Sequence, residues 1–173
     1  MPQISILKGL NTVNTQGIGM CSSKGPYNET DLTDATGTSG IGTLSSSSDG
    51  WYITLSQGEK MVGTAQVYDG IVYFVTYTPS ATSNACGYGT TKLYAVYYLN
   101  GGGTIITSNG NVTISNSAGA GASQYLTIGS GVPSSPVISK GNLIITTSTG
   151  AVLTQKIPSL PSKLLPTSWF QLP

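Results

Sequence analysis

The pair Asp69-Gly70 stands between two runs rich in Val, Ile, Tyr and Phe, inside the stretch Gln66 to Thr78. Asp-Gly is favoured in the tight two-residue turns that join antiparallel strands, because both central positions need a left-handed backbone. The stretch therefore predicts a β-hairpin. A further apolar and aromatic run from Leu93 to Leu99 predicts another strand. Together, Gly50 to Gly103 is expected to form three or four consecutive antiparallel strands.

The remainder of the chain repeats this pattern of short strands and turns. Asn109-Gly110 predicts a second hairpin, and Lys140-Gly141 predicts a third. The segments VYDGIVYFVT, from Val67, and VISKGNLIITT, from Val137, align as strand, Gly-containing turn and strand, which indicates an internal repeat. No long stretch has the apolar period of a helix. We predict an all-β fold, either antiparallel blades of a partial β-propeller, about three in number, or a β-sandwich.

Composition divides the chain into four predicted regions. These are a loop-rich N-terminal segment with the first strands (1–48), a central β-blade region (49–103), further hairpins or a last blade (104–155), and a Pro-rich C-terminal tail (156–173). Trp169 is expected to anchor the tail on the last blade.

Charge is scarce along the whole chain. Charged residues make up 8% of it and the net charge is +1, whereas ordinary soluble domains contain about 25% charged residues. With so few charges, the sequence contains no basic patch that would indicate binding to nucleic acid or anionic lipid. No apolar run reaches the length of about 18 residues that a membrane-spanning helix needs. The N-terminus does not read as a signal peptide, so a secreted form is expected to be processed or part of a longer protein.

The chain contains no histidine. This excludes a Ser-His-Asp or Cys-His catalytic pair and histidine-ligated zinc within the chain. The two cysteines, Cys21 and Cys86, lie in loop-like sequence. In an oxidising compartment they are predicted to form one disulfide, and the alternative is two separate buried thiols.

Two sets of side chains are candidates for a binding site. Glu29, Asp31 and Asp34 form an acidic cluster with the oxygen ligands that hard cations prefer, although Asp also caps backbone N–H groups in turns. Among the aromatic residues of the strands, Tyr97 and Tyr98 are expected to place one ring on each face of the sheet, so that one is exposed. Most of the other aromatic residues are expected to pack in the core. No cofactor is predicted.

Several motifs occur in the order and spacing of a known family. They are DLTD (31–34), DGWYITL followed by GEK (49–60), DGIVYFVTYTPS (69–80), GxGTTKLYAV followed by GG (87–102), GSGVPSSPVIS with TSTGAV (129–152), and a terminal Ser168-Trp169. In these motifs the chain resembles the C-terminal β-propeller region of PilY-type proteins, the type IV pilus tip-associated adhesins and biogenesis factors. The aspartate-rich calcium loop found in some members has no counterpart here.

The resemblance implies a non-enzymatic, extracellular protein at or near the pilus tip, active in pilus biogenesis and in adhesion. Its implied partners are pilus tip or minor pilin proteins, the remainder of a longer tip protein, and a host or abiotic surface. Two alternatives remain open. One is a structural subunit or cap of an extracellular filament. The other is a fragment of a quinoprotein-type propeller oxidoreductase, to whose blades the KLYAV strand is similar.

Overall fold

The computed structural model describes residues 3–7, 29–43, 49–80 and 88–158. This part of the chain is built from β-strands and one short 3-10 helix, which confirms the predicted all-β class. In chain order the elements are β1 (Gln3–Leu7), η1 (Glu29–Asp31), β2 (Leu32–Asp34), β3 (Gly50–Thr54), β4 (Lys60–Tyr68), β5 (Ile71–Thr78), β6 (Thr90–Tyr97), β7 (Ile105–Ser108), β8 (Asn111–Ile114), β9 (Tyr125–Ser130), β10 (Val137–Ser139), β11 (Asn142–Thr146) and β12 (Val152–Lys156).

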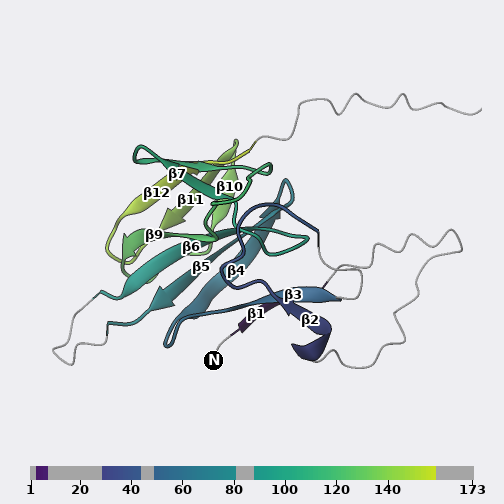
Figure 1. The fold of residues 1–173 in the computed structure, drawn as a ribbon. Helices are drawn as coiled ribbons and strands as arrows, with labels where there is room; N and C mark the ends of the chain where they lie inside the picture. Colours follow the sequence, from purple (N-terminus) through teal and green to yellow (C-terminus); the bar gives the residue numbers. More distant parts are fainter. Residues whose placement is uncertain (1–2, 8–28, 44–48, 81–87, 159–173) are drawn as a thin grey trace, which may run out of the picture.

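The strands form a central sheet with smaller sheets on both of its faces. The central sheet has the order β4-β5-β6-β9 and is antiparallel throughout. A second antiparallel sheet has the order β10-β11-β12, and a third has the order β1-β3-β2, in which β2 and β3 run parallel. The hairpin β7–β8 stands by itself. In Figure 1 the central sheet lies between β10–β12 above and β1–β3 below.

All three hairpin turns lie where the sequence predicts them. Asp69 and Gly70 have φ values of 49° and 74°, and Lys140 and Gly141 have 47° and 74°. Asn109 and Gly110 adopt the same left-handed pair of conformations between β7 and β8. Two consecutive left-handed residues are the signature of the type I′ turn, whose twist matches that of the strands it joins. The two aligned segments of the internal repeat thus form equivalent hairpins, each opening its own sheet.

At Gly141 the free-energy cost of the left-handed backbone conformation can be measured without a steric clash. A Cβ atom added at Gly141 meets no atom within 4 Å, so only its φ of 74° resists substitution. Gly141→Ala is expected to lower the free energy of unfolding by about 1–2 kcal/mol, the cost of the left-handed conformation. Gly119, whose added Cβ also has open space and whose φ is not left-handed, is the matched control. Equal stabilities of the two alanine variants in urea denaturation would contradict this expectation.

The central sheet separates two hydrophobic cores. On one face Ile71, Tyr73 and Leu93 pack with Ile105 of β7 and Leu143 of β11. On the other face the alternate residues of the same strands pack against the β1–β3 sheet, through Val72, Phe74, Tyr94, Val96, Ala35, Trp51, Ile53 and Leu55. Because successive side chains of a strand point to opposite faces, β5 needs apolar residues at every position to fill both cores. The uninterrupted run IVYFV meets this requirement.

The central sheet takes its fourth strand from a different place than the sequence suggests. Between Gly50 and Gly103, β4, β5 and β6 form three consecutive antiparallel strands, as expected, whereas β3 pairs with β1 and β2. The fourth position is filled by β9, which pairs with β6 after the β7–β8 hairpin. The central sheet therefore takes strands from both the 49–103 and the 104–155 regions. Within the described ranges, no helix has the length and hydropathy needed to cross a membrane.

Candidate functional site

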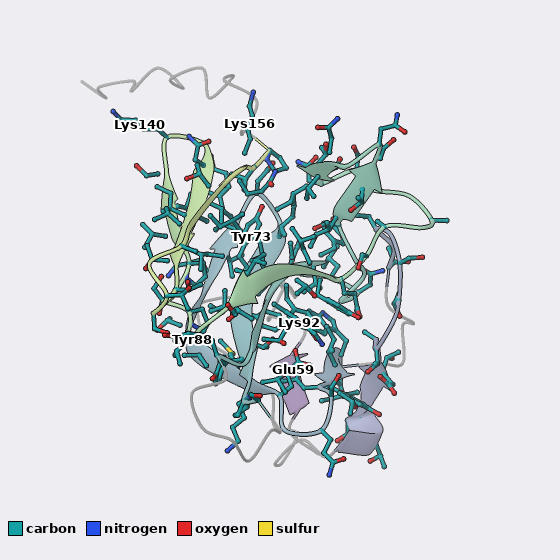
Figure 2. The ribbon with its side chains drawn as sticks, turned by 90° about the vertical axis from the view of Figure 1, so that its left-hand side faces the viewer. Glu59, Tyr73, Tyr88, Lys92, Lys140 and Lys156 are labelled. Carbon is teal, nitrogen blue, oxygen red and sulfur yellow. The ribbon has the colours of Figure 1, made fainter. Side chains whose placement is uncertain are left out.

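The most polar place in the interior is centred on Glu59, whose side chain is completely buried. Glu59 follows the turn that joins β3 to β4, and its backbone N–H donates to the Ser56 carbonyl at 3.0 Å. Its side chain reaches across β5 and β6 on the face turned toward the β1–β3 sheet. Figure 2 shows Glu59 and Lys92 on this side of the central sheet and Tyr73 on the opposite side.

Four donors converge on the two carboxylate oxygens of Glu59. Oε1 accepts from the Thr76 hydroxyl at 2.6 Å and from the Tyr94 hydroxyl at 3.1 Å. Oε2 accepts from Lys92 Nζ at 2.9 Å and from the backbone N–H of Ser56 at 3.3 Å. Thr76 and Lys92 are direct cross-strand partners, and Tyr94 follows Lys92 at the two-residue spacing that keeps both on one face. Regular strand pairing therefore assembles the donor set.

Aromatic rings enclose this ion pair. The Tyr94 ring stacks on Phe74 with centroids 4.7 Å apart and lies 5.3 Å from the ring of Tyr125. The Lys92 ammonium sits 4.4 Å above the Tyr125 ring, a cation–π geometry. Tyr125 is 44% exposed, so its ring forms the boundary between the cluster and solvent.

The surroundings of Glu59 keep it ionised. Burial raises the pKa of the carboxyl group, but the hydrogen bonds from Thr76, Lys92 and Tyr94 and the positive charge of Lys92 outweigh it, and the net pKa is lowered. Burial and the Glu59 charge raise the pKa of Tyr94, which therefore keeps its proton. A carboxylate of lowered pKa that already accepts four hydrogen bonds is a weak general base. The arrangement suits a structural anchor between the strands.

Tyr94 and Tyr73 offer a matched test of the hydrogen bonding at this cluster. Both hydroxyls are in the interior, but that of Tyr73 has no hydrogen-bond partner among the described residues. Tyr94→Phe is expected to lower the free energy of unfolding by about 2 kcal/mol, because it removes a bond to a charged acceptor. Tyr73→Phe removes a buried polar group and is expected to leave stability unchanged or raise it by about 1 kcal/mol. Thermal and urea unfolding check both; similar losses in the two variants would contradict the assignment.

A second polar junction ties the N-terminal part of the chain to the central sheet. The buried Gln124 donates through Nε2 to the carbonyls of Ala35, at 2.7 Å, and Gly101, at 2.6 Å, and its Oε1 accepts from the Gly37 N–H at 2.8 Å. Beside it, Trp51 Nε1 donates to the Tyr98 carbonyl at 2.9 Å. These contacts join segments that lie far apart in the sequence, and no local sequence signal indicates them.

The residues of the predicted acidic cluster lie on η1 and β2. Glu29 begins η1, but its side chain is outside the described residues; Asp31 ends η1, and its carbonyl accepts from the Asp49 N–H at 3.0 Å. Asp34 Oδ1 accepts from the Thr36 N–H at 2.9 Å, which is the turn-capping alternative. Within the described part of the chain, no group of three or more His, Cys, Asp or Glu side chains is placed to hold a metal ion.

The expectation that Tyr97 and Tyr98 point to opposite faces is wrong. Their rings contact each other edge-on, with centroids 5.3 Å apart and an interplanar angle of 70°. The reason is that β6 ends at Tyr97 and the backbone turns at Tyr98, whose N–H donates to the Gly70 carbonyl at 3.0 Å. Tyr98 is 41% exposed, so it remains a candidate for binding beside the β4–β5 turn.

Sequence reasoning did not single out Glu59, Lys92 or Gln124. Glu59 and Lys92 could have been found from the sequence, because a charged residue between or within apolar strands is unusual in a chain with so few charges. Cys21 and Cys86, for which a disulfide is predicted, lie outside the described residues.

Comparisons of the chain with protein-family models, with curated proteins and with solved structures found no significant match.

Proposed function

We propose that this chain is the C-terminal part of a PilY-type β-propeller that acts at or near the tip of type IV pili. In this proposal it works outside the cell, by contacts with tip or minor pilin proteins, with the remainder of a longer tip protein, or with a surface, and without catalysis. The disulfide between Cys21 and Cys86 belongs to the same proposal, because it suits an oxidising compartment.

The observation that carries the propeller assignment is the succession of sheets. A two-sheet sandwich buries one face of each sheet around a single core, whereas here the central sheet has a core on each face. The chain leaves β9, at one edge of the central sheet, and enters β10, at one edge of the next. Equivalent hairpins with the same turn open both sheets. Radial repetition of such antiparallel sheets is how propellers are built.

Several residues of the motifs that carry the resemblance are buried or closely packed in the fold. Trp51 of the DGWYITL motif is 1% exposed, Glu59 of GEK is the anchored carboxylate, and Gly101 approaches the Trp51 ring so closely that an added Cβ would lie 2.7 Å from it. Such residues support a shared fold. Specificity for a partner is expected to lie on exposed side chains, such as Tyr98 and Tyr88, which is 66% exposed.

Gold labelling of the bacterial surface tests the proposed location. Antibodies raised against this chain are expected to label the ends of surface filaments in electron micrographs. A strain lacking the major pilin is the control and should lose the filament-end label. Label along the whole length of the filaments would instead favour the structural-subunit alternative, and absence of label from filaments would contradict both.

A further inference from the structure

The chain contains two Asn-Gly pairs, Asn100-Gly101 and Asn109-Gly110, and the structure holds them differently. In such a pair the backbone nitrogen of glycine can attack the side-chain carbonyl carbon of asparagine, because glycine has no Cβ that would hinder the close approach. The attack requires an asparagine side chain and a glycine N–H that are not held by hydrogen bonds. It also requires a backbone that can rotate. These conditions distinguish the two pairs.

Asn100-Gly101 meets none of these conditions. The Asn100 side chain is held through both of its polar atoms, because Nδ2 donates to the Gly40 carbonyl at 3.3 Å and Oδ1 accepts from the Gly102 N–H at 3.1 Å. The Gly101 N–H donates to the Tyr97 carbonyl at 2.8 Å, and Gly101 itself is buried. This pair is therefore protected from ring closure.

Asn109-Gly110 forms the tip of the β7–β8 hairpin, where residues 106–111 are all exposed. Within the described ranges, neither the Asn109 side chain nor the Gly110 N–H has a hydrogen-bond partner. The hydrogen bond of a two-residue turn joins its flanking residues, here Ser108 and Asn111, and does not use the Gly110 N–H. Both reacting groups of this pair are therefore available.

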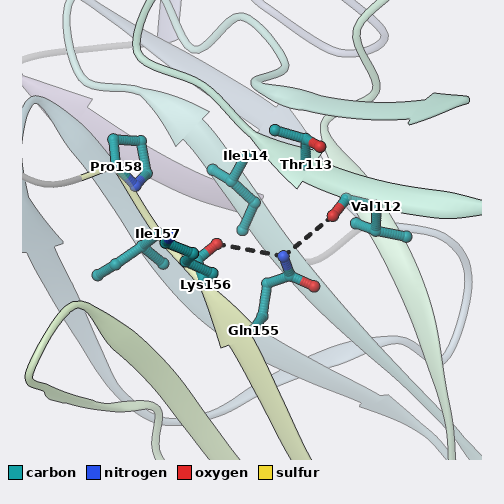
Figure 3. A pocket seen from close by; sticks show the side chains of 7 residues that line it. All are labelled: Val112, Thr113, Ile114, Gln155, Lys156, Ile157 and Pro158. Carbon is teal, nitrogen blue, oxygen red and sulfur yellow. Dashed lines mark hydrogen bonds between the residues drawn. The ribbon is translucent and has the colours of Figure 1, made fainter.

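The β7–β8 hairpin is fixed at its base and free at its tip. At the base, Ile105 and Ile114 are 1% and 4% exposed and belong to a hydrophobic core. Figure 3 shows that Gln155 Nε2 also donates to the Val112 carbonyl, at 3.1 Å. The hairpin is a two-stranded sheet by itself, so its tip has little support from neighbouring strands. Opening of the tip breaks few contacts and lets the backbone at Asn109 rotate.

We propose that Asn109 is a site of spontaneous deamidation through a five-membered succinimide ring. The Gly110 nitrogen loses its proton to hydroxide and forms a bond to Cγ of Asn109. The Cγ–Nδ2 bond breaks, and Nδ2 takes up a proton from water and leaves as ammonia. Water then opens the ring at either carbonyl, which gives aspartate or isoaspartate at this position. Water is the only co-reactant, and nothing is oxidised or reduced.

The product differs from the parent in charge and in the length of its backbone. The chain has seven Lys and Arg and six Asp and Glu residues, so one new carboxylate reduces the net charge from +1 to zero. A net charge near zero promotes association of a protein with itself. Isoaspartate also adds a methylene group to the backbone of the turn between β7 and β8. This reaction does not depend on the pilus location of the protein.

Incubation of the folded full chain at mildly alkaline pH, followed by peptide mapping with mass spectrometry, measures both pairs in the same molecules. Asn109 is expected to react at least about 10-fold faster than Asn100, because the hydrogen bonds that hold Asn100 must open first. In urea-unfolded protein the two rates should become similar. Equal rates in the folded protein, or a faster reaction at Asn100, would overturn the proposal. So would an Asn109 that stays intact in the folded protein while the unfolded protein reacts.

Two variants test the chemical route. Asn109→Asp supplies the product standard and should focus at the same isoelectric position as the aged parent protein. Gly110→Ala is expected to slow the reaction several-fold, because the added Cβ hinders attack by the nitrogen. Its strain at a φ of 77° would loosen the turn, so slower reaction reports on ring closure.

Gly119→Ala is the matched control, because Gly119 is exposed, has open space for a Cβ and is not left-handed. It should leave the rate at Asn109 unchanged. An undiminished rate in Gly110→Ala would overturn the route through the ring. Formation of aspartate without any isoaspartate would also overturn it, because direct hydrolysis of the side chain gives aspartate alone.

Discussion

Glu59→Gln is expected to lower the free energy of unfolding by about 3 kcal/mol at neutral pH, the lower end of the range for removing one partner of a buried ion pair. The lower end applies because the Lys92 side chain is 16% exposed and partly screened, whereas Glu59 is fully buried. The variant keeps the shape of the side chain. It removes the negative charge that accepts hydrogen bonds from Thr76, Tyr94 and Lys92. Urea unfolding monitored by circular dichroism measures the difference.

The same variant is expected to change how stability depends on pH. The pKa of Glu59 is lower in the folded protein than its ordinary value of 4.5. Folded protein therefore releases this proton more readily than unfolded protein, so the contribution of Glu59 is complete above pH 4.5 and is lost as pH falls through the folded-state pKa. The parent protein should lose stability over this acidic window more steeply than Glu59→Gln.

Asp34→Asn is the matched control for the Glu59 substitution. Asp34 is exposed, and its side chain serves a local turn. Replacing it is expected to cost less than about 1 kcal/mol, the usual range for exposed positions and single capping bonds. If the two variants lose the same stability, or if Glu59→Gln leaves the acid dependence unchanged, the cluster is not the anchor that we infer.

Trp51→Ala is expected to lower the free energy of unfolding by about 3–5 kcal/mol, the range for truncating a buried aromatic residue. Trp51 is 1% exposed and lies in the core between the β1–β3 sheet and the central sheet. Its indole N–H also holds the Tyr98 carbonyl at 2.9 Å. The substitution therefore leaves a cavity and an unpaired carbonyl at the junction of two sheets.

Two further variants separate these contributions. Trp51→Phe keeps most of the apolar volume and loses the hydrogen bond, so an intermediate loss is expected. Val67→Ala removes an apolar side chain that is 67% exposed on β4, and should change stability by less than about 0.5 kcal/mol. Differential scanning calorimetry measures all three. A Trp51→Ala protein as stable as Val67→Ala would mean that the β1–β3 sheet does not pack on the central sheet.

Local features of the fold could be predicted from the sequence. The turns at Asp69-Gly70, Asn109-Gly110 and Lys140-Gly141 were identifiable because their geometry depends on a pair of adjacent residues. The strands beside them were identifiable from β-branched and aromatic runs. The internal repeat of residues 67–76 and 137–147 corresponds to two equivalent hairpins for the same reason.

Partner choice between distant strands was not predictable. Nothing in the residues of β9 indicates that it pairs with β6 while the preceding hairpin, β7–β8, does not. The two-sided burial of β5 was also missed, because a period of two suggests one buried face, and only the placement of sheets on both sides makes Tyr73 and Phe74 equally buried.

The polar sites were the least predictable. The donors of the Glu59 cluster come from the β3–β4 turn, from β5 and from β6. They meet only when these strands pair in the correct register, so the cluster is a property of the assembled sheet. Tyr98 was misplaced because a strand end, which the sequence marks only loosely, decides where its ring points.

A blot of sheared surface filaments tests the central proposal most directly. Filaments are sheared from cells with and without the major pilin, and the fractions are run with and without reductant and probed for this sequence. The proposal predicts a band in the pilin-dependent fraction well above 17.8 kDa, as the end of a longer tip protein. A band near 17.8 kDa would favour the filament-subunit alternative. Absence from the filament fraction at either size would contradict the pilus assignment.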